Sequence, residues 1–266
     1  MKNIIQTNKY THGMKMIDTH MHADARSGED FREMYLAGID CGITCSYYPY
    51  KIPQDIVLLN HLNRILELDT KRAAEYGLDL KVALGIHPTN SNVNPEKIFE
   101  QLYKWIEAKQ IIAIGEIGLE DLTDSEIDIF KRQLDIADET KSKVIVHTPR
   151  KNKSEVLKVI LDIIPQHIDE SQAVIDHINP QVIGDVIDSS CMLGLTVQPQ
   201  KMDKFEAISI LDEYGFDRFL LNSDISNKPS DPLSVPKTVR ELERQGYKKS
   251  EIEKVSSKNA KEYFKI

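Results

Sequence analysis

The sequence predicts an α/β protein with the architecture of a TIM (β/α)8 barrel. Its length of 266 residues fits one such barrel, which typically needs about 250 residues. Eight short apolar runs alternate along the chain with segments of helical periodicity. Several of these runs end directly before a histidine, an aspartate or a glutamate, and the C-terminal ends of the strands are where this fold carries its chemistry.

The eight apolar runs are predicted to be parallel strands, because each intervening helix brings the chain back to the same edge of the sheet. Gly, Pro and polar residues mark the turns between them. The predicted strands cover residues 15–20, 42–47, 78–86, 111–115, 143–146, 173–176, 193–197 and 218–223.

The intervening segments are predicted to be helices. The longest, 55–76, carries an apolar stripe that includes Ile56, Leu59 and Leu62, and Gly77 ends it. The predicted helices cover residues 30–37, 55–76, 95–108, 124–140, 154–164, 180–189, 204–214, 234–245 and 250–264. Since neither a linker nor a low-complexity segment interrupts the alternation, we expect one domain over 15–266, preceded by an N-terminal extension over 1–14.

The composition points to a cytoplasmic protein without membrane contact. No apolar run approaches the roughly 20 residues that span a bilayer, and the first residues lack the apolar core of a signal peptide. The three cysteines, Cys41, Cys45 and Cys191, are too few for a disulfide framework. Cys41 and Cys45 could be imagined as metal ligands, but without a second pair nearby we expect buried thiols.

The formal net charge of −8 argues against a protein that grips long nucleic acid, because such proteins usually carry a basic face. A small ligand or the end of a nucleic acid remains compatible with this charge. The lysines near the C-terminus alternate with glutamates at helical spacings, which indicates a solvated helix face.

Six side chains at the ends of predicted strands form a candidate metal site. His20 and His22 are two residues apart at the end of the first strand, so their side chains point to the same side and can share one ion. The other four follow the fourth, fifth, sixth and eighth strands. They are Glu116, His147, His177 and Asp224.

This set of ligands suits one or two divalent transition-metal ions. Imidazoles favour zinc above all, with manganese, iron or nickel as alternatives, whereas calcium and magnesium prefer oxygen ligands. Six ligands are too many for one tetrahedral ion. We expect His20, His22 and Asp224 to hold one ion and His147 and His177 to hold the other. Glu116 would bridge the two.

Two ions that share a bridging carboxylate indicate hydrolysis, because they lower the pKa of a bound water and stabilise both the attacking and the leaving oxygen. We expect Glu116 and Asp224 to be the catalytic carboxylates, with Asp224 as the proton acceptor. We expect this metal site to be catalytic rather than structural, because purely structural metal sites tend to be closed and four-coordinate.

Three further residues are candidates for substrate contacts. His87 lies before a proline at a strand end, where it could contact substrate or simply cap a turn. Arg150 follows His147 by three residues, and Lys201 lies in the loop after the seventh strand. Both are expected on the rim of the barrel, as ligands of a substrate phosphate or as solvated loop cations.

Five motifs together resemble those of the TatD family of metal-dependent hydrolases, in the amidohydrolase superfamily. They are Ile17-Asp18-Thr19-His20-Met21-His22, Gly85-Ile86-His87-Pro88, Gly115-Glu116-Ile117-Gly118-Leu119, Val146-His147-Thr148 and Ser223-Asp224. The resemblance extends from about residue 15 to 259–264. It implies a TIM barrel with a one- or two-metal site and phosphodiesterase activity, often deoxyribonuclease activity on DNA ends.

The chain departs from the family pattern in the loops that face substrate. Glu120 and Asp121 stand where the family usually has Asp and aromatic residues, and 178–180 replaces a Cys-Phe-Ser-Gly-like loop. Around Asp224 the family reads Glu-Thr-Asp followed by a Pro-Tyr-Leu turn, and this chain does not. These departures concern the substrate more than the metal ligands, and phosphoester hydrolysis is our main hypothesis. Hydrolysis of a carboxylic ester or amide, as in a deacylase, is one alternative, and a non-catalytic, metal-stabilised binding protein is another.

Overall fold

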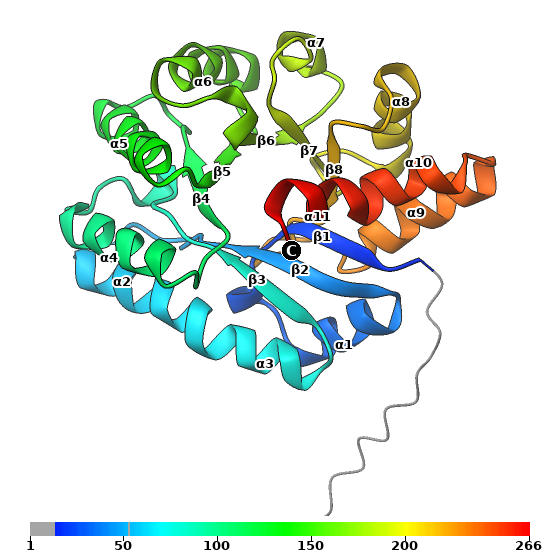
Figure 1. Ribbon diagram of the computed structural model, residues 1–266, viewed down its shortest axis with the longest axis horizontal. Coiled ribbons are helices and arrows are strands. Elements are labelled where there is room, and N and C mark those ends of the chain that lie inside the picture. Colours follow the sequence, from blue (N-terminus) through cyan, green and yellow to red (C-terminus); the bar gives the residue numbers. More distant parts are fainter. Residues whose placement is uncertain (1–13, 53) are drawn as a thin grey trace, which may run out of the picture.

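The computed structural model describes residues 14–52 and 54–266 and confirms the predicted barrel (Figure 1). Eight strands form one sheet in the order β1 to β8, and each strand is parallel to the next. The strands are β1 (Met16–Met21), β2 (Ile39–Cys45), β3 (Asp79–Ala83), β4 (Ala113–Gly118), β5 (Lys143–His147), β6 (Ala173–Ile178), β7 (Met192–Thr196) and β8 (Phe219–Asn222).

The segment that follows β8 closes the barrel against β1. The backbone N–H of Asp224 donates to the carbonyl oxygen of His20 over 2.9 Å. The backbone N–H of His22 donates to the carbonyl oxygen of Ile225 over 2.8 Å. Because these two bonds alternate along one edge, the closure itself sets Asp224 beside the two histidines at the end of β1.

Helices surround the strands as an outer ring (Figure 1). They are α1 (Gly28–Leu36), α2 (Asp55–Arg64), α3 (Thr70–Glu75), α4 (Glu96–Glu107), α5 (Asp124–Thr140), α6 (Lys153–His167), α7 (Ile183–Val186), α8 (Lys204–Tyr214), α9 (Ser234–Gln245), α10 (Lys249–Glu253) and α11 (Asn259–Phe264). Helices α1 and α8 each begin with a capping box, with Ser27 and Asp203 as the N-cap residues. These side chains satisfy backbone N–H groups of the first turn.

Several predicted boundaries were wrong. The predicted helix 55–76 is divided by a π-helical turn, Ile65–Asp69, and the predicted helix 250–264 by another, Lys254–Lys258. Such turns replace i→i+4 backbone bonds by i→i+5 bonds over a few residues, and the apolar pattern of the sequence did not reveal them. The predicted helix 180–189 shrinks to α7, because 180–182 form a turn instead.

The third strand is also shorter than predicted, because it ends at Ala83 rather than at residue 86. Beyond it, the Gln133 side chain accepts from the backbone N–H of Ile86 over 2.6 Å and donates to its carbonyl oxygen over 3.1 Å. A side chain of α5 thus replaces the neighbouring strand as the partner of this backbone. His87 lies just beyond this segment.

The N-terminal ends of the strands are covered by α11, which lies across the barrel in Figure 1. Ala260 and Phe264 of α11 pack against buried residues that the strands point into the barrel. These strand residues are Ile17, Ile43, Cys45, Ala83, Ala113, Ile145, Val174 and Leu220. One end of the barrel is therefore filled with apolar side chains, which leaves the C-terminal ends of the strands for polar groups.

The regular pairing of the strands is interrupted where the predicted metal ligands lie. The register shifts between Asp18 and Met21 in β1, between Gly115 and Ile117 in β4, and between Ile175 and Ile178 in β6. Such irregularities re-aim side chains and are common beside active sites. They turn His20, Glu116 and His177 toward a common centre.

Other predictions concern the surface and the cysteines. All three cysteines are free, with Cys45 and Cys191 buried and Cys41 half-buried. The C-terminal lysines are exposed or half-exposed, and three of them pair with glutamates three or four residues further along the chain. Within 14–52 and 54–266, no helix is both long and apolar enough to cross a membrane. The predicted extension, 1–14, lies outside the described residues except for Met14, and its separation from the barrel stays a prediction.

Candidate metal centre

The structure brings all six predicted ligands together at the C-terminal ends of the strands. Three overlapping groups each have their ligand atoms within 4.8 Å of one another. The groups are His20, His22 and Asp224; His20, Glu116 and His177; and His87, Glu116 and His147. The first and second groups share His20, and the second and third share Glu116, so the cluster is continuous.

His20, in β1, and His22, directly after it, both have an acceptor at Nδ1. The Nδ1 of His20 lies 2.5 Å from Asp176 Oδ2, and the Nδ1 of His22 lies 3.0 Å from the carbonyl oxygen of Cys45. Acceptors at Nδ1 fix the tautomer that leaves Nε2 free to ligate. The Nε2 of His20 is buried and has no hydrogen-bond partner among the described residues. A buried ring nitrogen that faces carboxylates and has no hydrogen-bond partner fits a bound cation, which would take the place of a proton there.

Glu116 lies at the centre of the cluster. Its Oε1 is 2.8 Å from His147 Nδ1 and 3.0 Å from His177 Nε2, and its Oε2 is 3.3 Å from His20 Nε2. Burial would raise the pKa of Glu116, but the charges and hydrogen bonds of these histidines hold that pKa well below its usual value. Glu116 is therefore an ionised carboxylate, and it contacts His20 with one oxygen and His147 and His177 with the other.

Asp224 presents its two carboxylate oxygens to different partners. Its Oδ1 is 3.1 Å from His22 Nε2, whereas its Oδ2 accepts from Lys201 Nζ over 2.5 Å and from Gln198 Nε2 over 3.0 Å. Burial opposes its ionisation, but Lys201 and His22 hold the pKa of Asp224 well below its usual value. One oxygen is thus anchored by the β7–α8 loop, and the other faces the histidines.

Two of the cluster residues have left-handed backbone conformations, which side chains other than glycine rarely adopt. The φ angle is 62° at His177 and 45° at Asp224. His177 is held there by a 2.7 Å contact between its Nδ1 and Thr196 Oγ1. Burial, with the nearby charge of Lys201, lowers the pKa of His177 to about 4, so the ring is neutral at neutral pH. Strained backbone of this kind concentrates at functional sites.

Asp176 is a positioning residue that the sequence reasoning missed. It orients His20 and accepts a hydrogen bond from Asn222 Nδ2 over 2.7 Å. A Cβ atom at Gly194 would lie 1.8 Å from Asp176 Oδ1, so the glycine of β7 leaves the space that this carboxylate occupies. Only its place directly before His177 marks Asp176 in the sequence.

Glu120 was also missed as a site residue. Its Oε2 lies 2.7 Å from His147 Nε2, while Glu116 contacts the Nδ1 of the same ring. His147 thus lies between two carboxylates. The available signal was positional: Glu120 stands where the resembled family has an acidic residue.

Of the two alternatives for His87, a substrate contact or the cap of a turn, the structure shows the cap. Its Nδ1 accepts from the backbone N–H of Thr89 over 3.1 Å, at the start of the 3-10 turn Pro88–Asn90. Burial and the charge of His147 hold the pKa of His87 well below its usual value, so the ring is neutral. A neutral ring whose Nδ1 accepts carries its proton on Nε2, which lies 3.8 Å from Glu116 Oε2. This N–H therefore faces the cluster at a distance from Glu116 that is too long for a hydrogen bond.

The cluster opens into a cavity of about 370 Å³. Arg150 and Lys201 line this cavity, but both also have protein partners. Arg150 donates to Gln198 Oε1 over 2.7 Å, and Lys201 pairs with Asp224. Besides residues of the three groups, its lining comprises Tyr47, Thr89, Glu120, Asp121, Arg150, Lys151, Lys201, Ser226 and Lys228. Contact of His87, Arg150 and Lys201 with substrate stays a prediction.

Lys153 stabilises the backbone next to the cluster. It is buried at the start of α6, and its Nζ donates to Thr148 Oγ1 over 2.6 Å and to the carbonyl oxygen of His177 over 3.1 Å. Burial lowers the pKa of Lys153 to about 7. Its amine therefore ties the end of β6, where His177 lies, to the loop after β5.

We expect Lys153→Met to lower the free energy of unfolding by about 1–3 kcal/mol, because it keeps the apolar stem and leaves buried acceptors without a donor. Urea denaturation measures the change. Lys158→Met, at an exposed position of the same helix, is the control and should stay within about 0.5 kcal/mol of the unaltered protein. Equal stability of the two variants would mean that Lys153 does not support the loop.

Together, the barrel and this cluster define the class: a (β/α)8 barrel protein with a candidate metal centre at the C-terminal ends of its strands. The model of the TatD-related DNase family matches residues 17–265. The chain belongs to that family, which confirms the resemblance seen in the motifs. An uncharacterized metal-dependent hydrolase of Methanocaldococcus jannaschii is 38% identical over 253 residues, which cover 94% of this chain and 100% of the relative.

Solved structures agree with this assignment. A TatD-like protein from Archaeoglobus fulgidus has a TM-score of 0.79 and 28% identity, over 94% of this chain and 100% of that protein. An organophosphorus hydrolase from Deinococcus radiodurans has a TM-score of 0.65 but only 14% identity, over 94% of this chain and 92% of that protein. The second likeness concerns the fold alone.

Proposed function

We propose that the protein is a metal-dependent hydrolase of phosphoester bonds, acting on small phosphoesters or on the ends of oligonucleotides. The observation that carries this proposal is the convergence of four histidines and two carboxylates around Glu116, with the unused Nε2 of His20 among them. Membership of the TatD-related DNase family, and the name of the Methanocaldococcus relative, support the reaction class.

The residues of the cluster fit one or two divalent transition-metal ions, of which zinc suits the imidazole-rich set best and manganese, iron or nickel are alternatives. His20, His22 and Asp224 would hold one ion, His147 and His177 the other, and Glu116 both. Such ions supply Lewis acidity and lower the pKa of water. Glu116, Asp224 and His177 are already in the deprotonated forms that ligands require.

The remaining chemistry belongs to the chain's own residues. Asp224 Oδ1 faces the cluster, where it can accept a proton from the attacking water, while Lys201 and Gln198 hold Oδ2 still. The Nε2 proton of His87 and the guanidinium of Arg150 would donate to phosphoryl oxygens in the cavity. The cavity, about 370 Å³ in volume, suits a small substrate or a chain end.

A screen of the metal-reconstituted protein tests the bond that is cleaved. The substrates are bis(p-nitrophenyl) phosphate, p-nitrophenyl phosphate, p-nitrophenyl acetate and an amino-acid p-nitroanilide. We expect turnover of phosphoesters to exceed that of the ester and the anilide. Preference for the ester or anilide would favour the deacylase alternative, and no turnover with full metal content would favour a metal-stabilised binding protein.

Any nuclease activity should act on ends and should depend only weakly on salt. The net charge of −8 and the few cations of the cavity can neutralise few phosphates, so a plot of log affinity against log salt should have a slope of magnitude below about 3. Binding of a labelled oligonucleotide at several salt concentrations measures it. Tight and steeply salt-dependent binding to the interior of a long duplex would contradict the expectation.

A further inference from the structure

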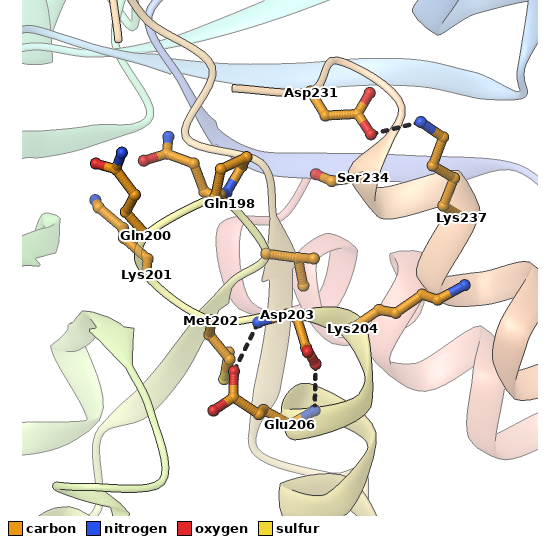
Figure 2. A pocket seen from close by; sticks show the side chains of 12 residues that line it. Gln198, Gln200, Lys201, Met202, Asp203, Lys204, Glu206, Asp231, Ser234 and Lys237 are labelled. Atoms are coloured by element: carbon orange, nitrogen blue, oxygen red, sulfur yellow. Dashed lines mark hydrogen bonds and ion pairs between the residues drawn. The ribbon is translucent and has the colours of Figure 1, made fainter. Parts of the chain in front are cut away.

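The metal cluster depends on two loops of the barrel rim. One is the β7–α8 loop, whose residues Gln198 and Lys201, drawn in Figure 2, donate to the carboxylate of Asp224. The other is the β1–α1 loop, which follows His22 directly and begins with the 3-10 turn Ala23–Ala25. Any group that holds this second loop therefore bears on the position of His22.

Two arginines bind the backbone of the β1–α1 loop. Arg72 of α3 donates from Nη2 to the carbonyl oxygen of Ala23 over 2.6 Å. Arg64, the last residue of α2, donates from Nη2 to the carbonyl oxygen of Asp24 over 3.1 Å. Hydrogen bonds from a charged donor are stronger than neutral ones. The two carbonyl groups directly after His22 are thus held by cations from the helical segment 55–75.

One carboxylate, that of Asp69, pairs with both arginines. Its Oδ1 lies 3.1 Å from Arg72 Nη2, and its Oδ2 lies 3.6 Å from Arg64 Nε. The Asp69 side chain is fully buried, and neither of its oxygens makes a hydrogen bond within the described part of the chain. The contacts are therefore ionic. Because a buried carboxylate requires counter-charges, Asp69 keeps the two guanidinium groups beside the loop.

The π-helical turn Ile65–Asp69 brings the three charges together. Arg64 and Asp69 are five residues apart, and in an α-helix such residues would point about 140° away from each other. The i→i+5 bonds of a π-turn bring residues five apart closer to one face. Arg72 follows Asp69 by three residues, which places it on the same face. The interruption of the helix therefore directs all three side chains toward one loop.

The β1–α1 loop also contacts the segment that follows Asp224. Arg26 Nη1 donates to the carbonyl oxygen of Ser226, two residues after Asp224, over 3.0 Å. The backbone N–H of Arg26 donates over 3.2 Å to the carbonyl oxygen of Ala23, the same oxygen that Arg72 binds. The loop thus connects the segments that follow two predicted ligands of one ion.

We propose that Asp69, Arg64 and Arg72 form a positioning network for the metal centre, although none of the three is a predicted ligand. The network holds the backbone after His22, and the ion that His22 would bind depends on it. The link to metal binding rests on the metal centre of the proposed function. The hold on the loop rests on the contacts alone.

Hydrogen exchange of the metal-free protein tests the hold on the loop. Arg72→Met keeps an apolar side chain beside the ring of Phe31 and removes the donor. The backbone N–H groups of Ala25 and Arg26 donate to carbonyl oxygens of this loop, those of residues 22 and 23. We expect these two amides to exchange about tenfold faster in Arg72→Met, the effect of one lost charged hydrogen bond.

Arg218→Met is the matched control. Arg218 also donates to backbone carbonyl oxygens, those of Ile187 and Cys191, but near the N-terminal end of β7. A general loss of stability would appear in both variants, whereas only Arg72→Met should accelerate exchange in the β1–α1 loop. Unchanged exchange in folded Arg72→Met, or equal acceleration in both variants, overturns the network.

Zinc affinity tests the link to the metal centre. In a titration with a competing chelator, Arg72→Met should bind one ion about tenfold more weakly and the other with unchanged affinity. Added to the double variant His20→Ala, His22→Ala, it should not change the affinity of the remaining ion. Equal weakening of both ions, or a further loss in the double variant, overturns the positioning role.

A double-mutant cycle tests whether Asp69 acts through the arginines. Asp69→Asn should weaken the same ion as Arg72→Met, and the combined variant should lose no more than Arg72→Met alone, because coupled residues are not additive. Fully additive losses would show that Asp69 acts independently of Arg72 and would overturn its place in the network.

Neither exchange nor zinc affinity requires turnover, so the network and the proposed function can fail separately. Lower zinc affinity of Arg72→Met, with no turnover of any screening substrate by the unaltered protein, would overturn the phosphoesterase function and uphold the network. Turnover of phosphoesters, with zinc affinity and exchange unchanged in Arg72→Met, would do the reverse.

Discussion

Asp224→Asn is expected to lower kcat by roughly 10²–10⁴, the usual contribution of a positioned acid or base, while the protein keeps at least one metal ion. The Oδ1 atom faces His22, and the variant removes its basicity without changing its shape. Asparagine also tolerates the left-handed backbone at this position, where φ is 45°. Turnover and metal content are to be measured on the same sample.

Two outcomes would change the role of Asp224. Recovery of activity on addition of excess metal would leave it as a ligand only. Near-normal turnover at full metal content would remove it from the mechanism. Asp231→Asn is the matched control, because Asp231 pairs with Lys237 and lies outside the metal cluster.

Glu116→Gln should have the broadest effect on the site. Glu116 contacts His20, His147 and His177, so its loss alters both predicted ion positions. Groups that only support metal ligands change metal affinity by about 10–100-fold, so loss of this central ligand should weaken binding by more than about 100-fold and lower kcat/KM at least as much. Titration with a competing chelator measures the affinity.

Glu100→Gln, at an exposed position of α4, is the control for the charge change and should bind metal normally. A folded Glu116→Gln protein that holds as much metal as the unaltered chain, with similar affinity, would show that Glu116 does not join the two groups of ligands. In that case two separate sites, or one site without Glu116, would replace the bridged arrangement.

The sequence was sufficient to predict the barrel and the convergence of the six candidate ligands at one rim, for a physical reason. Strand and helix periods are local, and parallel barrel strands bring their C-terminal ends to one rim. His20 lies in the first strand and Asp224 follows the last. Their positions at strand ends were therefore enough to place them together. The closure bond from Asp224 to His20 confirms that reasoning.

What the sequence could not predict depends on side chains that meet across the rim. For Lys201 the sequence offered a substrate contact or a solvated loop cation, and neither alternative reveals that its amine pairs with Asp224, where the loop 198–202 folds back on itself. Asp176 became a positioning residue only through a glycine on the neighbouring strand. Neither the fold of the loop 198–202 nor this close approach has a period or a spacing in the sequence that would reveal it.

The central claim is that these residues form a metal centre, and metal content tests it most directly. After removal of metal by a chelator, reconstitution with zinc and removal of excess, we expect about one to two equivalents per chain, because imidazole-rich sites bind such ions readily. The double variant His20→Ala, His22→Ala should lose one position selectively and hold correspondingly less metal. Less than about a tenth of an equivalent in the unaltered protein would contradict the metal centre.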